Sequence, residues 1–397
     1  MRRAERIRRL GPAVALFGAA GLIAGCGAES PVPAASTPAS SLPPAAPGAF
    51  AYVVDPQASV LLAFEAHAAS GELRLVEAHG LPPAWSRFPT RIAADPRGRF
   101  LYAGLANPSP GSGPTHTIRR FAVDGTTGRL LARGDAGVTF PPLSLAASES
   151  QVHVIGGVYV TGYIGSWDVF DVDPATGALR RASPPPWRFY PSLVVVDADG
   201  PGSLVYTVAA PSTAQADQEV MFASQWRDEG TLVDVDGINL QRRTSDVALG
   251  GSISFTADES GRISSRTFDA DTGQIRLLAR VYAFEGGWAR LALGRPTTPR
   301  LSTTAPLPGT LLAVSSGGGL RLLEVGENGE LSPRGSVALP ESEGVRRLAF
   351  HPSGRYLYTS GAGEGLRVFR IEPDGELQGT ARDPQGGGEI VLTAPPS

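Results

Sequence analysis

The sequence contains no lysine and only one cysteine, and both facts limit what the protein can be. All 35 basic residues among the 397 are arginine, against 38 acidic residues. A single cysteine excludes an internal disulfide framework. Without residues 1–25, 30 Arg stand against 37 acidic residues, which gives a net charge of −7. A mildly acidic chain is a poor candidate for nucleic-acid binding, because that needs clustered positive charge.

Common catalytic and metal-binding patterns are also missing. None of the five histidines falls in an HExxH or similar metal-ligand spacing, and the sequence has neither an EF-hand loop nor a nucleophile elbow. We therefore predict no metal and no cofactor, and assign no catalytic residue. The histidines are dispersed along the chain: His67, His79, His116, His153 and His351.

The N-terminus is typical of a secretion signal. Residues 1–9 are rich in arginine, and residues 10–25 are small and apolar, which is too short for a comfortable membrane span. The stretch from Leu22 to Cys26, Leu-Ile-Ala-Gly-Cys, resembles the bacterial lipobox. The resemblance implies cleavage before Cys26, acylation of this residue and anchoring in a membrane. The alternative is an ordinary buried cysteine.

The residues after Cys26 indicate in which membrane the protein is anchored and that a tether precedes the folded domain. In lipoproteins of Gram-negative bacteria, Asp after the lipidated cysteine retains the protein at the inner membrane; the Gly27 found here implies the outer membrane, if the cell is of that kind. Proline, alanine and serine dominate residues 27–48, which favours an extended, unpacked segment. We therefore expect a signal peptide over 1–25, a lipidated tether over 26–48 and a folded domain over 49–397.

The folded part repeats itself seven times. In each copy a glycine follows a polar turn, and Leu or Ile stands two residues later; the mean spacing is near 51 residues. A period of this size indicates one supersecondary unit per repeat. The glycine supplies the positive φ that such turns need. The seven glycines are Gly71, Gly128, Gly177, Gly230, Gly273, Gly329 and Gly375.

Each repeat predicts four antiparallel strands. Residues 91–102, RIAADPRGRFLY, give the clearest hairpin, in which a Pro-x-Gly turn joins two apolar strands, and residues 348–358 repeat it. A third strand ends near an aromatic residue such as Phe121, and the fourth starts after the glycine. Seven such repeats predict an all-β, seven-bladed β-propeller. The fourth and fifth blades, about 191–236 and 246–280, are degenerate.

The first repeat lacks its innermost strand. Residues 49–54 match the second strand of the other repeats, whereas residues 388–394 follow the seventh blade with no blade of their own. We expect residues 388–394 to complete the first blade, which would close the ring and remove its free edges.

The combined pattern resembles a known family. Pro-x-Gly-Arg-(Phe/Tyr)-Leu-Tyr, a strand ending in Phe, and Asp-x-x-Thr-Gly-x-Leu are similar to the lactonase-type propellers, the bacterial 6-phosphogluconolactonase group, over about 49–397. In that family the strand after the Pro-x-Gly turn often continues into an Asn-Glu pair. Here Tyr102 and Tyr358 continue without the Glu. The resemblance implies the fold, and the missing Glu argues against lactonase activity.

One set of loops is a candidate ligand site. Three of the five tryptophans precede innermost strands, each close to an arginine, and such loops open on one face of a propeller. Aromatic faces and guanidinium groups suit a sugar-like or anionic ligand; the alternative is that they pack between blades. The candidates are Trp85, Arg87, Trp187, Arg188, Tyr190, Trp288, Arg290 and Arg346.

Three functions remain open from the sequence. The first is a lipid-anchored, monomeric propeller of the cell envelope that binds a small ligand or a protein partner without catalysis. The second is a hydrolase acting on a sugar lactone or a sugar-acid ester. The third is a structural component of an envelope assembly. Because propellers carry many functions, the fold alone cannot choose among them.

Overall fold

The computed structural model describes residues 48–81, 90–106, 116–159, 163–182, 190–196, 204–210, 219–227, 231–240, 242–250, 253–269, 272, 274–284, 288–294, 310–316, 318–339, 344–361, 365–383 and 385–395. The predicted signal peptide and all of the tether except its last residue, Gly48, lie outside these ranges, and so does Cys26. Among the described residues, no helix has the length and apolar character needed to cross a membrane.

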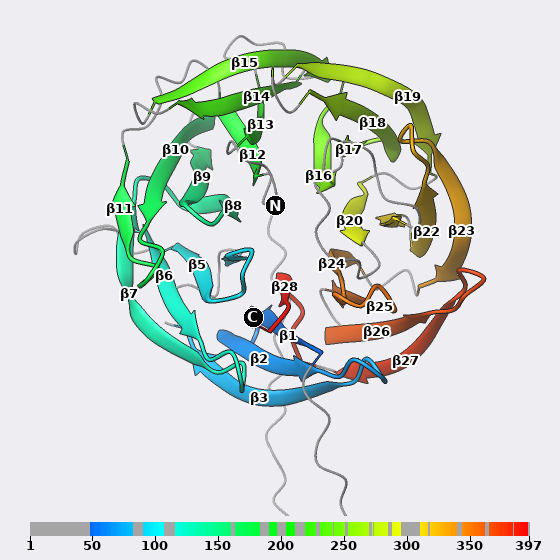
Figure 1. Cartoon of the computed structure of the whole chain (residues 1–397), viewed down its shortest axis with the longest axis horizontal. Coiled ribbons are helices and arrows are strands. Elements are labelled where there is room, and N and C mark those ends of the chain that lie inside the picture. Colours follow the sequence, from blue (N-terminus) through cyan, green and yellow to red (C-terminus); the bar gives the residue numbers. More distant parts are fainter. Residues whose placement is uncertain are drawn as a thin grey trace, which may run out of the picture. The chain divides into compact units, whose positions relative to one another are not determined.

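The described strands form seven four-stranded antiparallel sheets, arranged as the blades of a ring (Figure 1), which confirms the predicted propeller. Blades are numbered along the chain and their strands are given from the inside outward. Blade one is β28 (Ile390–Thr393), β1 (Ala49–Asp55), β2 (Val60–Ala66) and β3 (Leu73–Gly80). Blade two is β4 (Arg91–Ala94), β5 (Phe100–Ala106), β6 (His116–Val123) and β7 (Leu130–Val138). Blade three is β8 (Pro142–Ala147), β9 (Gln151–Tyr159), β10 (Tyr163–Val172) and β11 (Leu179–Arg181).

The other four blades follow the same order. Blade four is β12 (Tyr190–Val196), β13 (Leu204–Ala210), β14 (Glu219–Arg227) and β15 (Thr231–Leu240). Blade five is β16 (Thr244–Gly250), β17 (Ile253–Asp258), β18 (Arg262–Phe268) and β19 (Ile275–Ala283). Blade six is β20 (Arg290–Gly294), β21 (Leu311–Ser316), β22 (Gly319–Val325) and β23 (Leu331–Ala338). Blade seven is β24 (Val345–Phe350), β25 (Tyr356–Gly361), β26 (Gly365–Ile371) and β27 (Leu377–Asp383).

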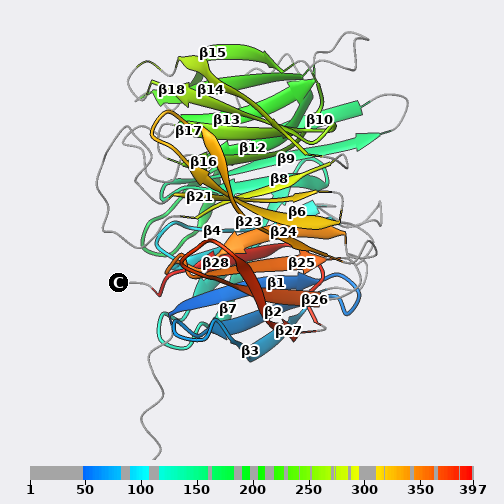
Figure 2. The ribbon, with the colours of Figure 1, turned by 90° about the vertical axis from the view of Figure 1, so that its right-hand side faces the viewer.

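The last strand of the chain closes the ring. β28 pairs with β1 in antiparallel register, with Phe50 opposite Thr393 and Val53 opposite Ile390, and the two strands lie side by side in both views (Figures 1 and 2). Just before β28, the backbone N–H of Gly388 donates to Val54 O at 2.9 Å. The prediction that residues 388–394 complete the first blade is confirmed.

The recurring glycines join neighbouring blades as well as shaping turns. Gly128 has a φ of +71°, and a Cβ placed on it would lie 2.3 Å from the ring of Phe50 in the preceding blade. In addition, Tyr52 Oη donates to Gly128 O at 3.1 Å. Gly71 meets Tyr356 and Tyr358 of blade seven in the same way. Only glycine satisfies both the backbone conformation and the close approach.

Apolar side chains fill the boundaries between blades. Seven clusters of buried residues in the described ranges each draw on two adjacent blades, so the core is divided among the seven boundaries. The boundary between blades one and seven, for example, buries Phe64, Tyr358 and Leu366.

Candidate functional site

Five charged residues meet where the inner strands of five blades begin. Arg91 and Arg290 are the first residues of β4 and β20, and Glu389 directly precedes β28. Asp246 and Arg347 are the third residues of β16 and β24. Inner strands of a propeller run in the same direction around the axis, so their starting ends lie together. We call these five residues the axial cluster.

Glu389 links three consecutive blades through its two carboxylate oxygens. Arg347 Nε, in blade seven, donates to Glu389 Oε2 at 2.6 Å, and Arg91 Nη1, in blade two, donates to Oε1. The side chain of Glu389 is 13% exposed, and those of Arg347 and Arg91 are 22% and 23% exposed. The pairs are therefore only partly screened by water and stronger than exposed ion pairs.

Asp246 extends the cluster across the ring. Its Oδ2 lies 4.0 Å from Arg347 Nη1, although blades five and seven are not adjacent. The backbone N–H groups of Val247 and Leu291 donate to its two oxygens at 3.1 Å and 3.0 Å. The carboxylate is thus held in one orientation by two neighbouring blades.

Arg290 is held by backbone rather than by an acid. Its Nη1 donates to Ser245 O at 2.7 Å, which joins blades six and five. Within the described ranges, no carboxylate forms an ion pair with Arg290, and its pKa is lowered, first by burial and then by the positive charge of Arg347. An added anion would relieve this unfavourable electrostatic environment.

The pKa values of the two carboxyl groups in the cluster are shifted in opposite directions. Burial alone would raise the pKa of Glu389, but the attraction of Arg347 and Arg91 outweighs it and the pKa is lowered. At Asp246 burial is the stronger effect, and the pKa is raised despite the opposing charge of Arg347. Glu389 therefore stays ionised to a lower pH than an ordinary glutamate, whereas Asp246 is protonated more readily than an ordinary aspartate.

The cluster has more donors and more positive charge than its own acids use. Three guanidinium groups face two carboxylates even when both acids are ionised. Arg91 Nε is buried and has no hydrogen-bond partner within the described part of the chain. Guanidinium groups bind carboxylate and phosphate oxygens in pairs. This arrangement can bind a small organic anion.

The predicted loop residues fall into three groups. Trp85, Arg87, Trp187 and Arg188 lie outside the described residues. Tyr190 begins the inner strand of blade four, and only its backbone is described. Trp288 is 57% exposed beside β20, Arg290 belongs to the axial cluster, and the side chain of Arg346 is exposed.

Sequence reasoning missed Arg91, Asp246, Arg347 and Glu389. The position of Arg91, at the start of an inner strand just after a candidate loop, is a signal that was available. For Arg347 the signal is hidden, because the β24–β25 pairing shifts register between Val345 and Arg347. This bulge leaves Arg346 exposed and brings Arg347 to the axis.

The histidines stay apart from this cluster. Ser353 N donates to His351 Nδ1 at 3.0 Å and Gly354 N to His351 O at 2.8 Å, so His351 organises a turn. His153 is fully buried, and burial lowers its pKa to about 3. In the described ranges, no three His, Cys, Asp or Glu side chains are grouped to hold a metal ion.

The fold and the axial cluster define a seven-bladed propeller with a charged centre, and comparison with solved structures finds proteins of similar fold. The chain is similar to the periplasmic gluconolactonase PpgL of Pseudomonas aeruginosa, with 17% identity, a TM-score of 0.64, and coverage of 88% of this chain and 99% of that one. It is also similar to a putative 6-phosphogluconolactonase from Bacteroides uniformis, with 14% identity, a TM-score of 0.59, and coverage of 87% and 99%.

A protein from Desulfotomaculum acetoxidans described as functionally unknown has 14% identity and a TM-score of 0.61, with coverage of 87% of this chain and 99% of that one. No protein-family model matches the chain, and no curated protein matches it significantly. The structural neighbours thus include 6-phosphogluconolactonase-like seven-bladed propellers, and at these identities they establish the fold.

Proposed function

We propose that the protein binds a small organic anion of the sugar-acid type against the axial cluster, without catalysis. The observation that carries the proposal is the excess of guanidinium groups over carboxylates among Arg91, Arg290, Arg347, Asp246 and Glu389. A ligand carboxylate would supply the missing negative charge. Its hydroxyl groups would find acceptors in the two acids and donors in the arginines.

The partial burial of the cluster favours binding over simple ion exchange. Side chains that are 13–23% exposed still reach solvent, yet their charges interact more strongly than on an open surface. One charge-assisted hydrogen bond contributes about 1.5–3 kcal/mol, which corresponds to roughly a ten- to hundredfold change in affinity. Loss of one arginine should therefore be measurable.

The names of the structural neighbours support the sugar-acid class. One is called a gluconolactonase and two are called putative 6-phosphogluconolactonases, and the hydrolysis of either lactone gives a hydroxylated carboxylate. A propeller that keeps the binding chemistry and has lost the reaction would still recognise such an acid.

Lactone hydrolysis is the second candidate, and Asp246 is the observation that favours it. The Asp246 carboxylate is held in place beside guanidinium groups and has a raised pKa. It could accept a proton from a water molecule while that water attacks a lactone carbonyl. Arg347 or Arg290 could then stabilise the oxyanion. As the acyl C–O bond breaks, Asp246 would return this proton to the ring oxygen, which leaves as a hydroxyl group, and the oxygen of the water becomes part of the new carboxyl group.

We further propose that the protein is a lipoprotein of the cell envelope, anchored through Cys26. The lipobox-like sequence and the position of the only cysteine support this proposal. An anchored propeller would sample ligands in the compartment that its membrane faces. A monomeric propeller needs no further chain to complete the axial cluster, since all five residues come from one chain.

A panel of sugar acids and sugar lactones tests the proposal. D-gluconate, 6-phosphogluconate and neutral glucose would be screened by thermal shift and calorimetry, and the corresponding lactones by a pH-stat assay for released acid. Binding of the acids with no acid release supports the non-catalytic reading. Acid release that disappears in Asp246→Asn would instead support the lactonase. Binding of glucose as tight as that of gluconate would argue against an anion site.

A further inference from the structure

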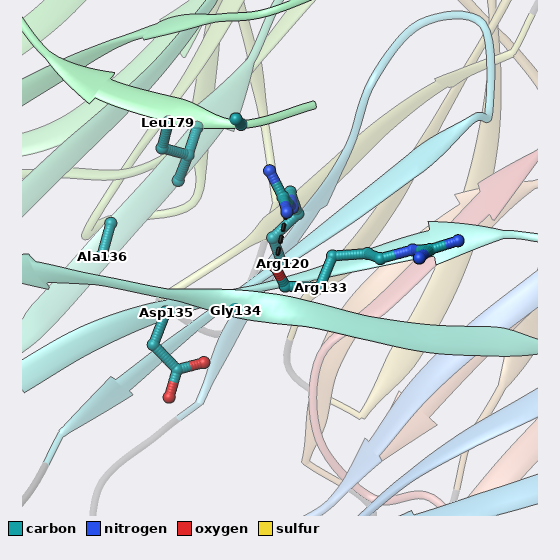
Figure 3. A pocket seen from close by; sticks show the side chains of 7 residues that line it. Arg120, Arg133, Gly134, Asp135, Ala136 and Leu179 are labelled. Atoms are coloured by element: carbon teal, nitrogen blue, oxygen red, sulfur yellow. Dashed lines mark hydrogen bonds between the residues drawn. The ribbon is translucent and has the colours of Figure 1, made fainter. Parts of the chain in front are cut away.

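A second basic site lies away from the axis, at the boundary between blades two and three. A cleft of about 160 Å³ lies between β7 and the start of β11, and Figure 3 shows the side chains that line it. Its lining consists of Arg120, Arg133, Gly134, Asp135, Ala136, Ala178 and Leu179. None of these residues belongs to the axial cluster, and they come from the third and fourth strands of their blades and the turn before β11 rather than from inner strands.

The charges of the cleft do not balance. Asp135 points away from Arg120 (Figure 3), and both of its oxygens accept hydrogen bonds from Arg119, at 2.9 Å each. Arg120 donates to the backbone oxygen of Arg133. Among the described residues, neither Arg120 nor Arg133 has a carboxylate within ion-pair distance. The charge of Arg120 acts at longer range on the exposed Asp173, whose pKa is lowered first by a hydrogen bond from Thr176 and last by Arg120. Two positive charges therefore remain beside one small cleft.

Arg120 also has an unused donor. Its Nε is buried and has no hydrogen-bond partner in the described part of the chain. Arg120 stands opposite Gly134 in the β6–β7 register. A Cβ placed on Gly134 would have no neighbouring atom within 4 Å, so there is open space beside Arg120. A buried N–H group without a partner is costly, and a bound oxygen atom would remove that cost.

We propose that this cleft binds a phosphate monoester whose organic part is small and apolar. A phosphate monoester carries about −1.5 to −2 charges at pH 7, which matches the two unpaired guanidinium groups better than a single carboxylate does. Its oxygens can be bound by both guanidinium forks. Ala136, Ala178 and Leu179 supply the apolar wall for the organic group.

The cleft and the axial cluster are independent. The cleft is formed by the β6–β7 and β10–β11 hairpins, whereas the axial cluster is formed at the starts of inner strands. The proposal therefore does not rest on the sugar-acid function, and either site could be correct without the other. Variants of one site should leave ligand binding at the other unchanged.

Calorimetry with phenyl phosphate, inorganic phosphate and neutral phenol tests the proposal. The wild-type protein should bind phenyl phosphate more tightly than inorganic phosphate, and phenol should not bind. Arg120→Gln and Arg133→Gln should each weaken phenyl phosphate by about ten- to a hundredfold. Arg129→Gln, in the turn between β6 and β7, removes the same charge outside the cleft and should change affinity less than about twofold.

Folding must be checked in the same variants. The side chain of Arg133 is exposed, so Arg133→Gln should keep the wild-type melting temperature and decides the matter if Arg120→Gln is unstable. Absence of phenyl phosphate binding to wild type, or unchanged affinity in Arg133→Gln, overturns the proposal. So does loss of binding in Arg91→Gln, because the phosphate would then occupy the axial cluster.

Discussion

Arg347 Nε donates a hydrogen bond to Glu389 Oε2 at 2.6 Å, and this bond ties the last complete blade to the strand that closes the ring. Glu389 also binds Arg91 in blade two, so one carboxylate connects both sides of the closure. The closure of the fold and the proposed ligand site therefore share a residue. Changes at Glu389 should affect stability first, whereas changes at the arginines should affect binding as well.

Glu389→Gln should destabilise the protein by about 3 kcal/mol near neutral pH, because it leaves two partly buried arginines without their acid. The pKa of Glu389 is lowered from its ordinary value of 4.5. Its contribution is therefore complete above about pH 4.5 and is lost as the pH falls through the lower value of the folded state. Urea unfolding of both proteins at several pH values measures this.

The matched control is Glu149→Gln, which breaks the exposed ion pair between Glu149 and Arg97. It should change the free energy of unfolding much less than Glu389→Gln does. A difference between wild type and Glu389→Gln that grows as the pH falls below 4.5 would contradict the assigned role.

Gly128→Ala should cost about 2–4 kcal/mol of stability, since alanine at φ +71° is strained and its Cβ would meet the ring of Phe50 at 2.3 Å. Gly80→Ala is the control, because a Cβ there would meet nothing within 4 Å. Chemical denaturation of both variants gives the comparison. Equal stability of the two would show that the turn tolerates a side chain.

Removal of residues from Gly388 onward should abolish cooperative unfolding. The truncation deletes β28, leaves the inner edge of β1 unpaired and removes Glu389 from the axial cluster. Calorimetric scans would show a broad, low-temperature transition or none. A truncated protein with the wild-type melting temperature would mean that β28 is dispensable for closing the ring.

Cys26→Ser should prevent acylation and leave an unprocessed or soluble protein. Metabolic labelling with a fatty-acid analogue should mark the wild-type chain and leave the variant unmarked, and fractionation should move the variant out of the membrane pellet. Labelling of the variant at wild-type intensity would remove the basis for the lipid anchor.

The turns and the ring could be predicted because their signals are local. An Asp four residues before glycine accepts hydrogen bonds from the turn, as Asp124 does from Thr126 and Thr127 at 3.0 Å and 2.8 Å. The same residue types recur every 51 residues or so, and the repeat then fixes the number of blades. The closing strand could be predicted because the first repeat lacks its innermost strand and residues 388–394 have no blade of their own.

The axial cluster could not be predicted because its members are distant in sequence and depend on register. A bulge between Thr244 and Asp246 in the β16–β17 pairing decides which side chain of β16 turns toward the axis, and β24 has a similar bulge before Arg347. Strand alternation alone gives no warning of either shift. From the sequence, Glu389 is predicted only as part of the closing strand, residues 388–394.

The most direct test of the account is calorimetric titration of D-gluconate into wild type, Arg91→Gln and Arg347→Gln, with Arg346→Gln as the control of equal charge. Arg346 is exposed, whereas Arg91 and Arg347 both bind Glu389 in the axial cluster. We expect D-gluconate to bind to wild type, to lose about tenfold or more in affinity for the two cluster variants, and to lose less than about twofold for the control. Absence of binding to wild type, or the same affinity in all four proteins, would contradict it.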